Sequence, residues 1–247
     1  MSMRGVADVV FCIDVSTSME PCIAGVKDNI GAFLDGLTSS RQEAWDLRFD
    51  YAAHCAGEGA GFPQWSLFND ALIPALYWPH VGGGRYFTTD VAELRRGLGR
   101  LGCVGDEAPL VGLDSALDFP WRERCHRVVV MLTDEPFESG IFQEPQLAVL
   151  DALIEKMQAL RVMLFLVAPA SPTYETLAEA DRCEWIEIDK VGDGLASVDF
   201  RKVLSHIGKS VSASNANQGP AKTVQRGIFG QATWIEGTNP VTKEDRK

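Results

Sequence analysis

The sequence predicts an α/β protein with a doubly wound, mostly parallel central sheet and helices on both faces of that sheet. Two observations lead to this prediction. Apolar runs alternate along the chain with segments whose apolar residues recur at helical spacing. The runs are apolar at almost every position, as in strands buried on both faces. The length of 247 residues is enough for one large α/β domain or two small ones. Apolar residues make up 46% of the chain, which is enough to form a buried core.

The first third of the chain begins this alternation. Residues 8–14 are an apolar run that predicts a buried strand. Residues 21–37 predict a helix, because their apolar side chains recur every three or four positions. Residues 47–54 alternate between apolar and polar side chains, which predicts a strand with one wetter face.

The segment from residue 55 to 86 is rich in Gly and aromatic residues and has the weakest pattern. Short strands are expected near residues 65–69 and 75–79. A helix follows, with Thr88 or Thr89 as its expected N-cap, because acidic residues occupy the first turn after them.

The rest of the chain continues the alternation up to about residue 209. The run 127–133 has the most β-branched residues and is expected at the centre of the sheet. The other predicted strands are residues 161–168 and 184–188. The predicted helices are residues 109–117, 145–160, 173–180 and 199–209.

A change of composition near the C-terminal end predicts two parts. Residues 1–210 form the α/β domain, and residues 211–247 form a polar linker and tail. The tail contains four large apolar residues in a polar setting, so it is either disordered or docks on this domain or a partner. These residues are Ile228, Phe229, Trp234 and Ile235.

The charge and the cysteines restrict the function and the setting. A formal net charge of −11 argues against binding nucleic acid or an anionic membrane surface. No segment has the roughly 20 apolar residues that span a bilayer, and the N-terminus lacks the apolar region of a signal peptide. The six cysteines are scattered, without zinc-binding spacing, so reduced thiols in the cytoplasm are expected.

The segment Asp14-Val15-Ser16-Thr17-Ser18 directly follows the first predicted strand. It places one carboxylate and hydroxyl groups where a strand ends and a helix begins. Hard cations such as Mg²⁺ take oxygen ligands, and open α/β sheets bind ligands beyond the carboxyl ends of their strands. A helix cap is the alternative role for the same residues, because Ser and Asp are favoured capping residues.

A second acidic loop, Thr133-Asp134-Glu135, follows the predicted central strand. Both loops are expected at the same edge of a parallel sheet. Together the two loops resemble the von Willebrand factor A (VWA) domain, whose metal-ion-dependent adhesion site (MIDAS) carries the pattern Asp-x-Ser-x-Ser. The resemblance covers roughly residues 7–209 and implies that Asp14, Ser16 and Ser18 hold Mg²⁺, or another divalent cation such as Mn²⁺ or Ca²⁺. It also implies that Asp134 contacts the ion directly or through water.

The loop before the predicted helix 109–117 departs from the VWA pattern. Ala108 and Leu110 stand where a Thr or an acidic ligand is expected, so Asp106, Glu107 or water would complete the coordination. The middle position of the first motif also differs mildly, because Thr17 stands where many members of the family have Gly. The geometry of the ion therefore stays open at this stage.

The resemblance implies a non-enzymatic adaptor of the bacterial cytosolic type, in which the ion binds an acidic residue of a partner protein. It implies an ATPase, a kinase or a phosphatase as the class of system that such an adaptor serves. Two other functions stay open. One is a metal-dependent hydrolase or transferase that uses the same site, and the other is a structural module with a degenerate site.

Other catalytic patterns are weak. A haloacid-dehalogenase-type phosphatase needs a second Asp two residues after Asp14, and Ser16 occupies that position. His54 and Cys55 are neighbours on a predicted strand, so their side chains are expected to point to opposite faces of the sheet. A packed His54 is therefore expected instead of a Cys–His pair.

Overall fold

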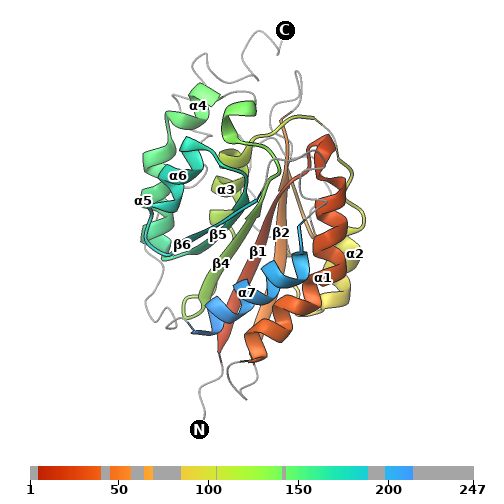
Figure 1. Ribbon diagram of the computed structural model, residues 1–247. Coiled ribbons are helices and arrows are strands. Elements are labelled where there is room, and N and C mark those ends of the chain that lie inside the picture. The colour runs from red at the N-terminus through yellow and green to blue at the C-terminus, as the bar shows by residue number, and fades with distance from the viewer. Residues whose placement is uncertain are drawn as a thin grey trace.

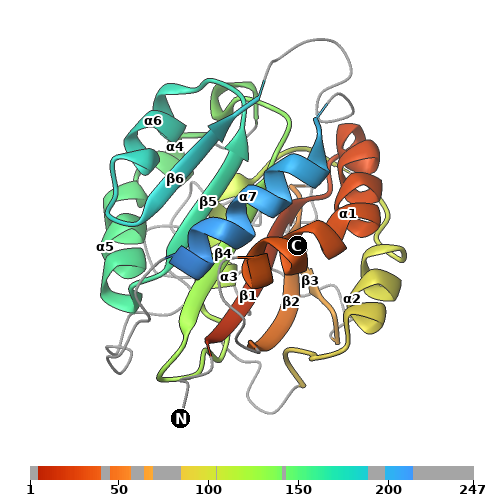
Figure 2. The ribbon, with the colours of Figure 1, turned by 60° about the horizontal axis from the view of Figure 1, so that its bottom comes forward.

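The computed structural model describes residues 5–39, 45–56, 64–68, 85–103, 105–140, 143–188 and 198–213. Within these ranges, a six-stranded sheet has the order β3-β2-β1-β4-β5-β6 (Figures 1 and 2). The strands are β1 (Val6–Asp14), β2 (Asp46–His54), β3 (Gln64–Ser66), β4 (His126–Leu132), β5 (Met163–Ala168) and β6 (Cys183–Glu187).

All neighbouring strands are parallel except β2 and β3, which are antiparallel. The carboxyl ends of the parallel strands therefore share one edge of the sheet, at the top of Figure 1. This arrangement confirms the doubly wound, mostly parallel sheet expected from the sequence.

Helices cover both faces of the sheet (Figures 1 and 2). One face carries α1 (Glu20–Ser39), α2 (Val91–Leu98) and α7 (Phe200–Ala213). The other face carries α3 (Pro109–Leu117), α5 (Leu150–Leu160) and α6 (Pro172–Ala178). The short elements are η1 (Thr17–Met19), η3 (Phe137–Ser139) and α4 (Gln143–Leu147).

The central strand β1 shows why the sheet needs helices on both faces. Phe11 and Ile13 pack in the core beneath α1 and α7, whereas Val10 and Cys12 pack in the core beneath α3 and α5. Because successive side chains of a strand point to opposite faces, a run that is apolar throughout contributes to two cores at once. By the same alternation, Asp14 lies on the α3 face.

Three boundaries differ from the sequence prediction. The predicted helix 145–160 is two helices, α4 and α5, because α4 turns so that the buried Gln146 can accept a hydrogen bond from the N–H of Leu110 at 3.1 Å. This contact satisfies one of the free N–H groups in the first turn of α3. The N-cap of α2 is Asp90, whose side chain accepts a hydrogen bond from the N–H of Ala92, so Thr88 and Thr89 were wrongly assigned.

The third difference is at the C-terminal end of the domain. The last helix, α7, continues to Ala213, with Val211 and Ser212 buried, so the first three residues of the predicted linker are helical. The rest of the predicted tail and the expected strand at residues 75–79 lie outside the described residues. The linker and tail therefore stay a prediction for the residues after Ala213.

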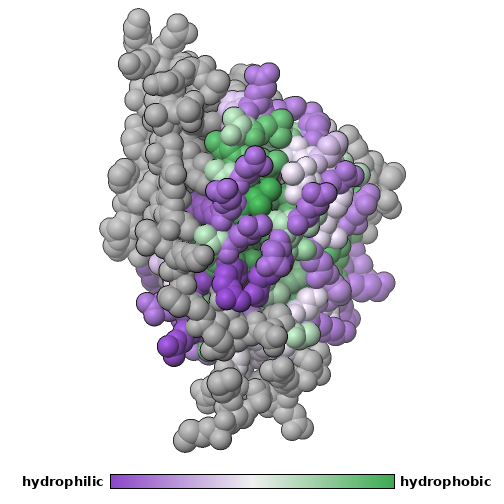
Figure 3. Space-filling model, turned by 90° about the vertical axis from the view of Figure 1, so that its left-hand side faces the viewer, coloured by the Kyte–Doolittle hydropathy of each residue, from purple (hydrophilic) through white to green (hydrophobic). Residues whose placement is uncertain are grey.

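The outer surface of the described residues is mostly polar. The side formed by α4, α5 and α6 shows apolar areas interrupted by hydrophilic side chains (Figure 3). Leu147 of α4 is the large apolar residue with substantial exposure in the described part of the chain, at 45%. No helix among the described residues has the length and apolar character needed to cross a membrane.

Candidate metal site

The two predicted loops meet at the carboxyl edge of the sheet. Strands β1 and β4 are parallel neighbours, with Ile13 opposite Leu132 in the register. The next residues, Asp14 and Thr133, therefore leave the sheet side by side. Their proximity was predicted from the sequence, since both loops follow buried strands.

Asp14 is fully buried, and both of its carboxylate oxygens accept hydrogen bonds. The N–H of Ser16 donates to Oδ1 at 2.7 Å. The hydroxyl of Thr133 donates to Oδ2 at 3.4 Å. One contact comes from its own loop and the other from the neighbouring loop, so the orientation of the carboxylate is fixed from two sides.

The hydroxyl groups of the first loop connect it to Asp134. The Oγ atoms of Ser16 and Ser18 lie 3.3 Å apart. The hydroxyl of Ser18 donates to Oδ1 of Asp134 at 3.0 Å. Ser16 precedes the short helix η1 but makes no side-chain capping bond to it. Helix capping alone therefore does not explain these serines, because their hydroxyls bond across the site.

The third loop brings Glu107 toward this group. Its carboxyl group lies near the side chain of Ser16, which lowers the pKa of Glu107, and it acts electrostatically on Asp14. Asp106 is placed differently: its side chain is exposed, and its N–H and C=O pair with Ala56 at 2.7 Å each. Of the two acidic residues that the sequence left open, Glu107 is the one whose side chain contacts the other predicted ligands.

A glycine makes this arrangement of the third loop possible. Gly105 has a φ of +76°, which side chains with a Cβ rarely adopt. A Cβ at this position would also lie 2.2 Å from the carbonyl oxygen of Ala56. The close pairing of the loop with Ala56, and the resulting position of Glu107, therefore depend on Gly105.

The site concentrates negative charge. Burial raises the pKa of Asp14 well above its usual range, and the nearby Glu107 and Asp134 raise it further. Burial also raises the pKa values of Glu107 and Asp134. Within the described residues, no Lys or Arg forms an ion pair with any of these three carboxylates. A bound cation would compensate their charges.

The donor atoms fit a hard divalent cation, because all of them are carboxylate or hydroxyl oxygens. No group of three or more His, Cys, Asp or Glu side chains is close enough to share one ion in the described part of the chain. An ion at this site would therefore depend on hydroxyl oxygens from Ser16, Ser18 and Thr133 beside the carboxylates, and on water. The fit is one of chemistry and location.

His54 and Cys55 do not form a catalytic pair. His54 is buried against Gly112, and neither ring nitrogen has a hydrogen-bond partner among the described residues. Burial lowers the pKa of His54 to about 3, so the ring is neutral. Cys55 packs in the core on the opposite face, and burial raises its pKa to about 12. This separation follows from the alternation of side chains along β2, as expected.

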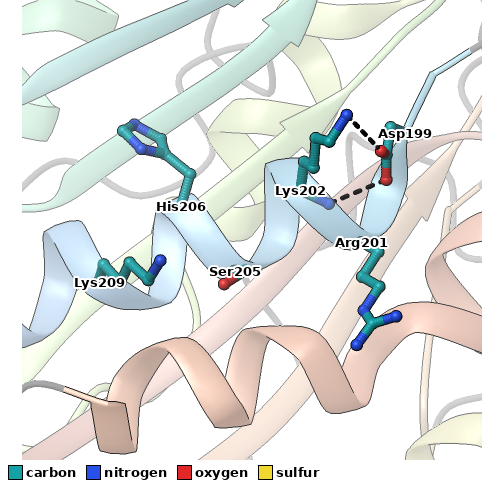
Figure 4. Close-up of a pocket in the computed structure, with 6 residues that line it drawn as sticks. All are labelled: Asp199, Arg201, Lys202, Ser205, His206 and Lys209. Atoms are coloured by element: carbon teal, nitrogen blue, oxygen red, sulfur yellow. Dashed lines mark hydrogen bonds and ion pairs between the residues drawn. The ribbon is translucent and has the colours of Figure 1, made fainter.

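A surface depression on α7 is separate from the candidate metal site (Figure 4). It lies on the helix that covers the other face of the sheet from Asp14. The described residues that line it are mostly basic or polar: Asp199, Arg201, Lys202, Ser205, His206 and Lys209. Lys202 pairs with Asp199, and His206 pairs with Glu184, so part of this charge is neutralised locally.

Two groups that the sequence analysis did not assign also contact the site. Thr133 bonds Asp14 directly, and the Thr-Asp pattern was the available signal for it. Tyr174 of α6 reaches the loop of Asp134 through its hydroxyl group. Nothing in the local sequence around Tyr174 indicates this contact, because it depends on how α6 packs.

Comparisons with known proteins rest on structure alone. No protein-family model and no curated protein matches the chain. A solved structure of a von Willebrand factor type A protein from Catenulispora acidiphila matches with a TM-score of 0.52 and 17% identity, covering 83% of this chain and 42% of that one. Proximal thread matrix protein 1 from the mussel byssus matches with a TM-score of 0.52 and 14% identity, covering 90% and 49%.

A further structure of the mussel protein, described as having a zinc-occupied MIDAS motif, matches with a TM-score of 0.48 and 14% identity, covering 90% of this chain and 49% of that one. This chain therefore spans less than half the length of each of these structures. At identities this low, structural similarity shows the fold alone. The function has to be inferred from the site itself. The strand order, the two-sided helical cover and the match to the Catenulispora acidiphila structure together show that the chain has the fold of von Willebrand factor A domains.

Proposed function

We propose that this protein is a metal-ion-dependent protein-interaction module. In this proposal, Asp14, Ser16 and Ser18 hold a divalent cation, with Mg²⁺ as the first choice, and Asp134 and Glu107 support it. A carboxylate of a partner protein completes the coordination of the ion. The observation that carries the proposal is the connection of Asp14, Ser16, Ser18 and Asp134 across two loops at the carboxyl edge of the sheet.

The charge of the site supports a cation as its ligand. Three carboxyl groups with raised pKa values lie on neighbouring loops, two of them acting electrostatically on Asp14, and the described residues provide no basic side chain to pair with them. Burying like charges is costly unless a counter-charge is present. A divalent cation supplies that charge, and it also attracts an acidic group from a partner to an otherwise repulsive surface.

The proposal also includes a class of partner and a cellular setting. Resemblance to bacterial cytosolic VWA adaptors points to a protein partner in an ATPase, kinase or phosphatase system. All six cysteines are free, which is consistent with a reducing compartment such as the cytoplasm. We propose no nucleic-acid or membrane ligand, because the net charge of −11 opposes both.

The proposal is tested by capturing partners on the full-length protein from the native cell, with Mg²⁺ and with chelator. A genuine partner should bind in Mg²⁺, leave in chelator and fail to bind the D14N variant. D106N is the matched control, because the side chain of Asp106 is exposed and its contacts are made by the main chain. Partner binding that survives both chelator and D14N would contradict the proposal.

The competing function is a hydrolase or transferase that uses the same ion. A substrate screen in Mg²⁺ compares wild-type protein with D14N. Turnover that is present in the wild type and absent in D14N would assign enzymatic activity to this site. We expect no turnover above background in either protein.

A further inference from the structure

We propose that Tyr174 is a positioning residue for the ion site, acting through the loop that carries Asp134. This inference rests on the proposed function, since it assigns a residue that orients the proposed ligands. Tyr174 lies in the first turn of α6, and its side chain is completely buried. It belongs to a different element from every predicted ligand.

The hydroxyl group of Tyr174 contacts the loop on both sides of Asp134. It donates a hydrogen bond to the carbonyl oxygen of Glu135 at 3.3 Å. It also lies near the side-chain hydroxyl of Thr133. Because these two residues are the direct neighbours of Asp134, a single hydroxyl group restricts the backbone that presents this carboxylate.

The same hydroxyl is also linked to Asp14. Thr133 lies beside the Tyr174 hydroxyl and donates through Oγ1 to Oδ2 of Asp14 at 3.4 Å. A chain of polar contacts therefore runs from α6 through Thr133 to the carboxylate on β1. Groups that orient metal ligands through hydrogen bonds affect ion affinity although they do not touch the ion.

Other contacts hold α6 against this loop and so fix the position of the Tyr174 hydroxyl. The rings of Tyr174 and Phe137 meet edge to face, with centroids 6.5 Å apart. The carboxylate of Glu138 accepts bonds from the hydroxyl of Thr173 at 2.9 Å and from its N–H at 3.3 Å. The side chain of Ser171 caps the helix by accepting from the N–H of Tyr174.

These contacts separate the two roles of the Tyr174 side chain. The ring fills the core between α6 and η3, and phenylalanine would fill that space equally well. The hydroxyl adds the hydrogen bond to Glu135 and a polar contact near Thr133. A buried tyrosine hydroxyl requires partners, and here the partners are the loop residues that flank a proposed ligand.

The test is the Mg²⁺ and Mn²⁺ affinity of Y174F, measured by isothermal titration calorimetry beside the wild type. We expect Y174F to bind both ions at least about tenfold more weakly, as is usual when an orienting hydrogen bond is lost. Y86F is the control for removing a hydroxyl elsewhere, since Tyr86 packs against Phe119 in the core and lies outside the loops of the site. Y86F should bind the ions as the wild type does.

The thermal unfolding of the ion-free proteins distinguishes positioning from general stability. A purely structural role would lower the unfolding temperature of Y174F and leave its ion affinity unchanged, and that result would overturn the inference. If Y174F does not fold, Y174L removes the same hydroxyl with a smaller side chain, and wild-type affinity in a folded Y174L protein would also overturn the inference. Absence of ion binding to the wild type would instead refute the proposed function.

Discussion

Two buried aspartates at opposite ends of β1 have contrasting surroundings. Asp8 accepts hydrogen bonds from the guanidinium groups of Arg48 and Arg122 at 2.6–2.9 Å. Asp14 accepts bonds only from an N–H and a hydroxyl group among the described contacts. Burial would raise both pKa values, but the arginines outweigh burial at Asp8, so its pKa lies below its usual value. The pKa of Asp14 is raised. The chain supplies the counter-charge of Asp8, whereas we propose that an ion supplies that of Asp14.

Replacing Asp8 with Asn should destabilise the protein, because two arginines would lose their buried partner. We expect a loss of about 3 kcal/mol at pH 7, as is typical when one member of a buried ion pair is removed. Urea unfolding of D8N and of the wild type measures this difference in the free energy of unfolding. D46N is the control: Asp46 pairs with the same Arg122, but its side chain is 52% exposed, so its loss should cost less than about 1 kcal/mol.

The pH dependence of this difference has a defined sign. The pKa of Asp8 in the folded protein is below the usual aspartate value of 3.8, so its ionised form stabilises the fold above that pH. The stability advantage of the wild type over D8N should be constant near neutral pH and decline as the pH falls below about 4. A difference that grows on acidification would contradict this account of Asp8.

At the scale of elements, the sequence predicted the order and type of most helices and strands, because continuous apolar runs and helical spacing are local signals. The break between α4 and α5 was missed, since it depends on the side chain of Gln146 reaching Leu110 on another helix. The choice between Asp106 and Glu107 was also beyond local pattern. The pairing of the third loop with Ala56 sets where these two side chains lie, and Glu107 as a supporting ligand stays a proposal. The contact of Tyr174 with the Asp134 loop depends on tertiary packing in the same way.

Helices α1 and α7 approach each other closely at Gly36, where a Cβ would lie 2.3 Å from the carbonyl oxygen of Ser205. Because that neighbour is backbone, G36A should push α7 outward and destabilise the protein by about 2 kcal/mol. Gly31 of the same helix is the control, since its Cβ would meet only the end of the Arg95 side chain at 3.6 Å. G31A should be neutral or stabilising by up to about 1 kcal/mol. Thermal unfolding of both variants checks the contrast, and equal losses would contradict it.

At the scale of the whole molecule, the proposed ion site and the ion pairs of Asp8 lie at opposite edges of the sheet. The ion site lies at the carboxyl ends of β1 and β4, and the Asp8 cluster lies at the start of β1. Binding at the upper edge should therefore stabilise the fold without altering the lower cluster. This separation makes the two sets of variants independent, so their effects on stability should add.

Ion binding should raise the thermal stability of the whole domain. A ligand that binds only the folded state stabilises it by about 2.7 kcal/mol when its concentration is 100 times its dissociation constant. Mg²⁺ should therefore raise the unfolding temperature of the wild type and of D8N to a similar extent. Differential scanning fluorimetry across a Mg²⁺ series measures the shift. A rise in D8N that is much smaller than in the wild type would contradict the independence of the two ends of β1.

The most direct test of the central claim is a Mg²⁺ titration of wild type, D14N and D106N by isothermal titration calorimetry. The wild type and D106N should bind one ion with affinities within about twofold of each other, and D14N should lose at least about 100-fold. Ion-free D14N should remain folded, because the substitution removes a buried charge that lies near two other carboxyl groups. Unchanged Mg²⁺ affinity in a folded D14N protein, or no binding by the wild type, would contradict the claim that Asp14 is the centre of an ion site.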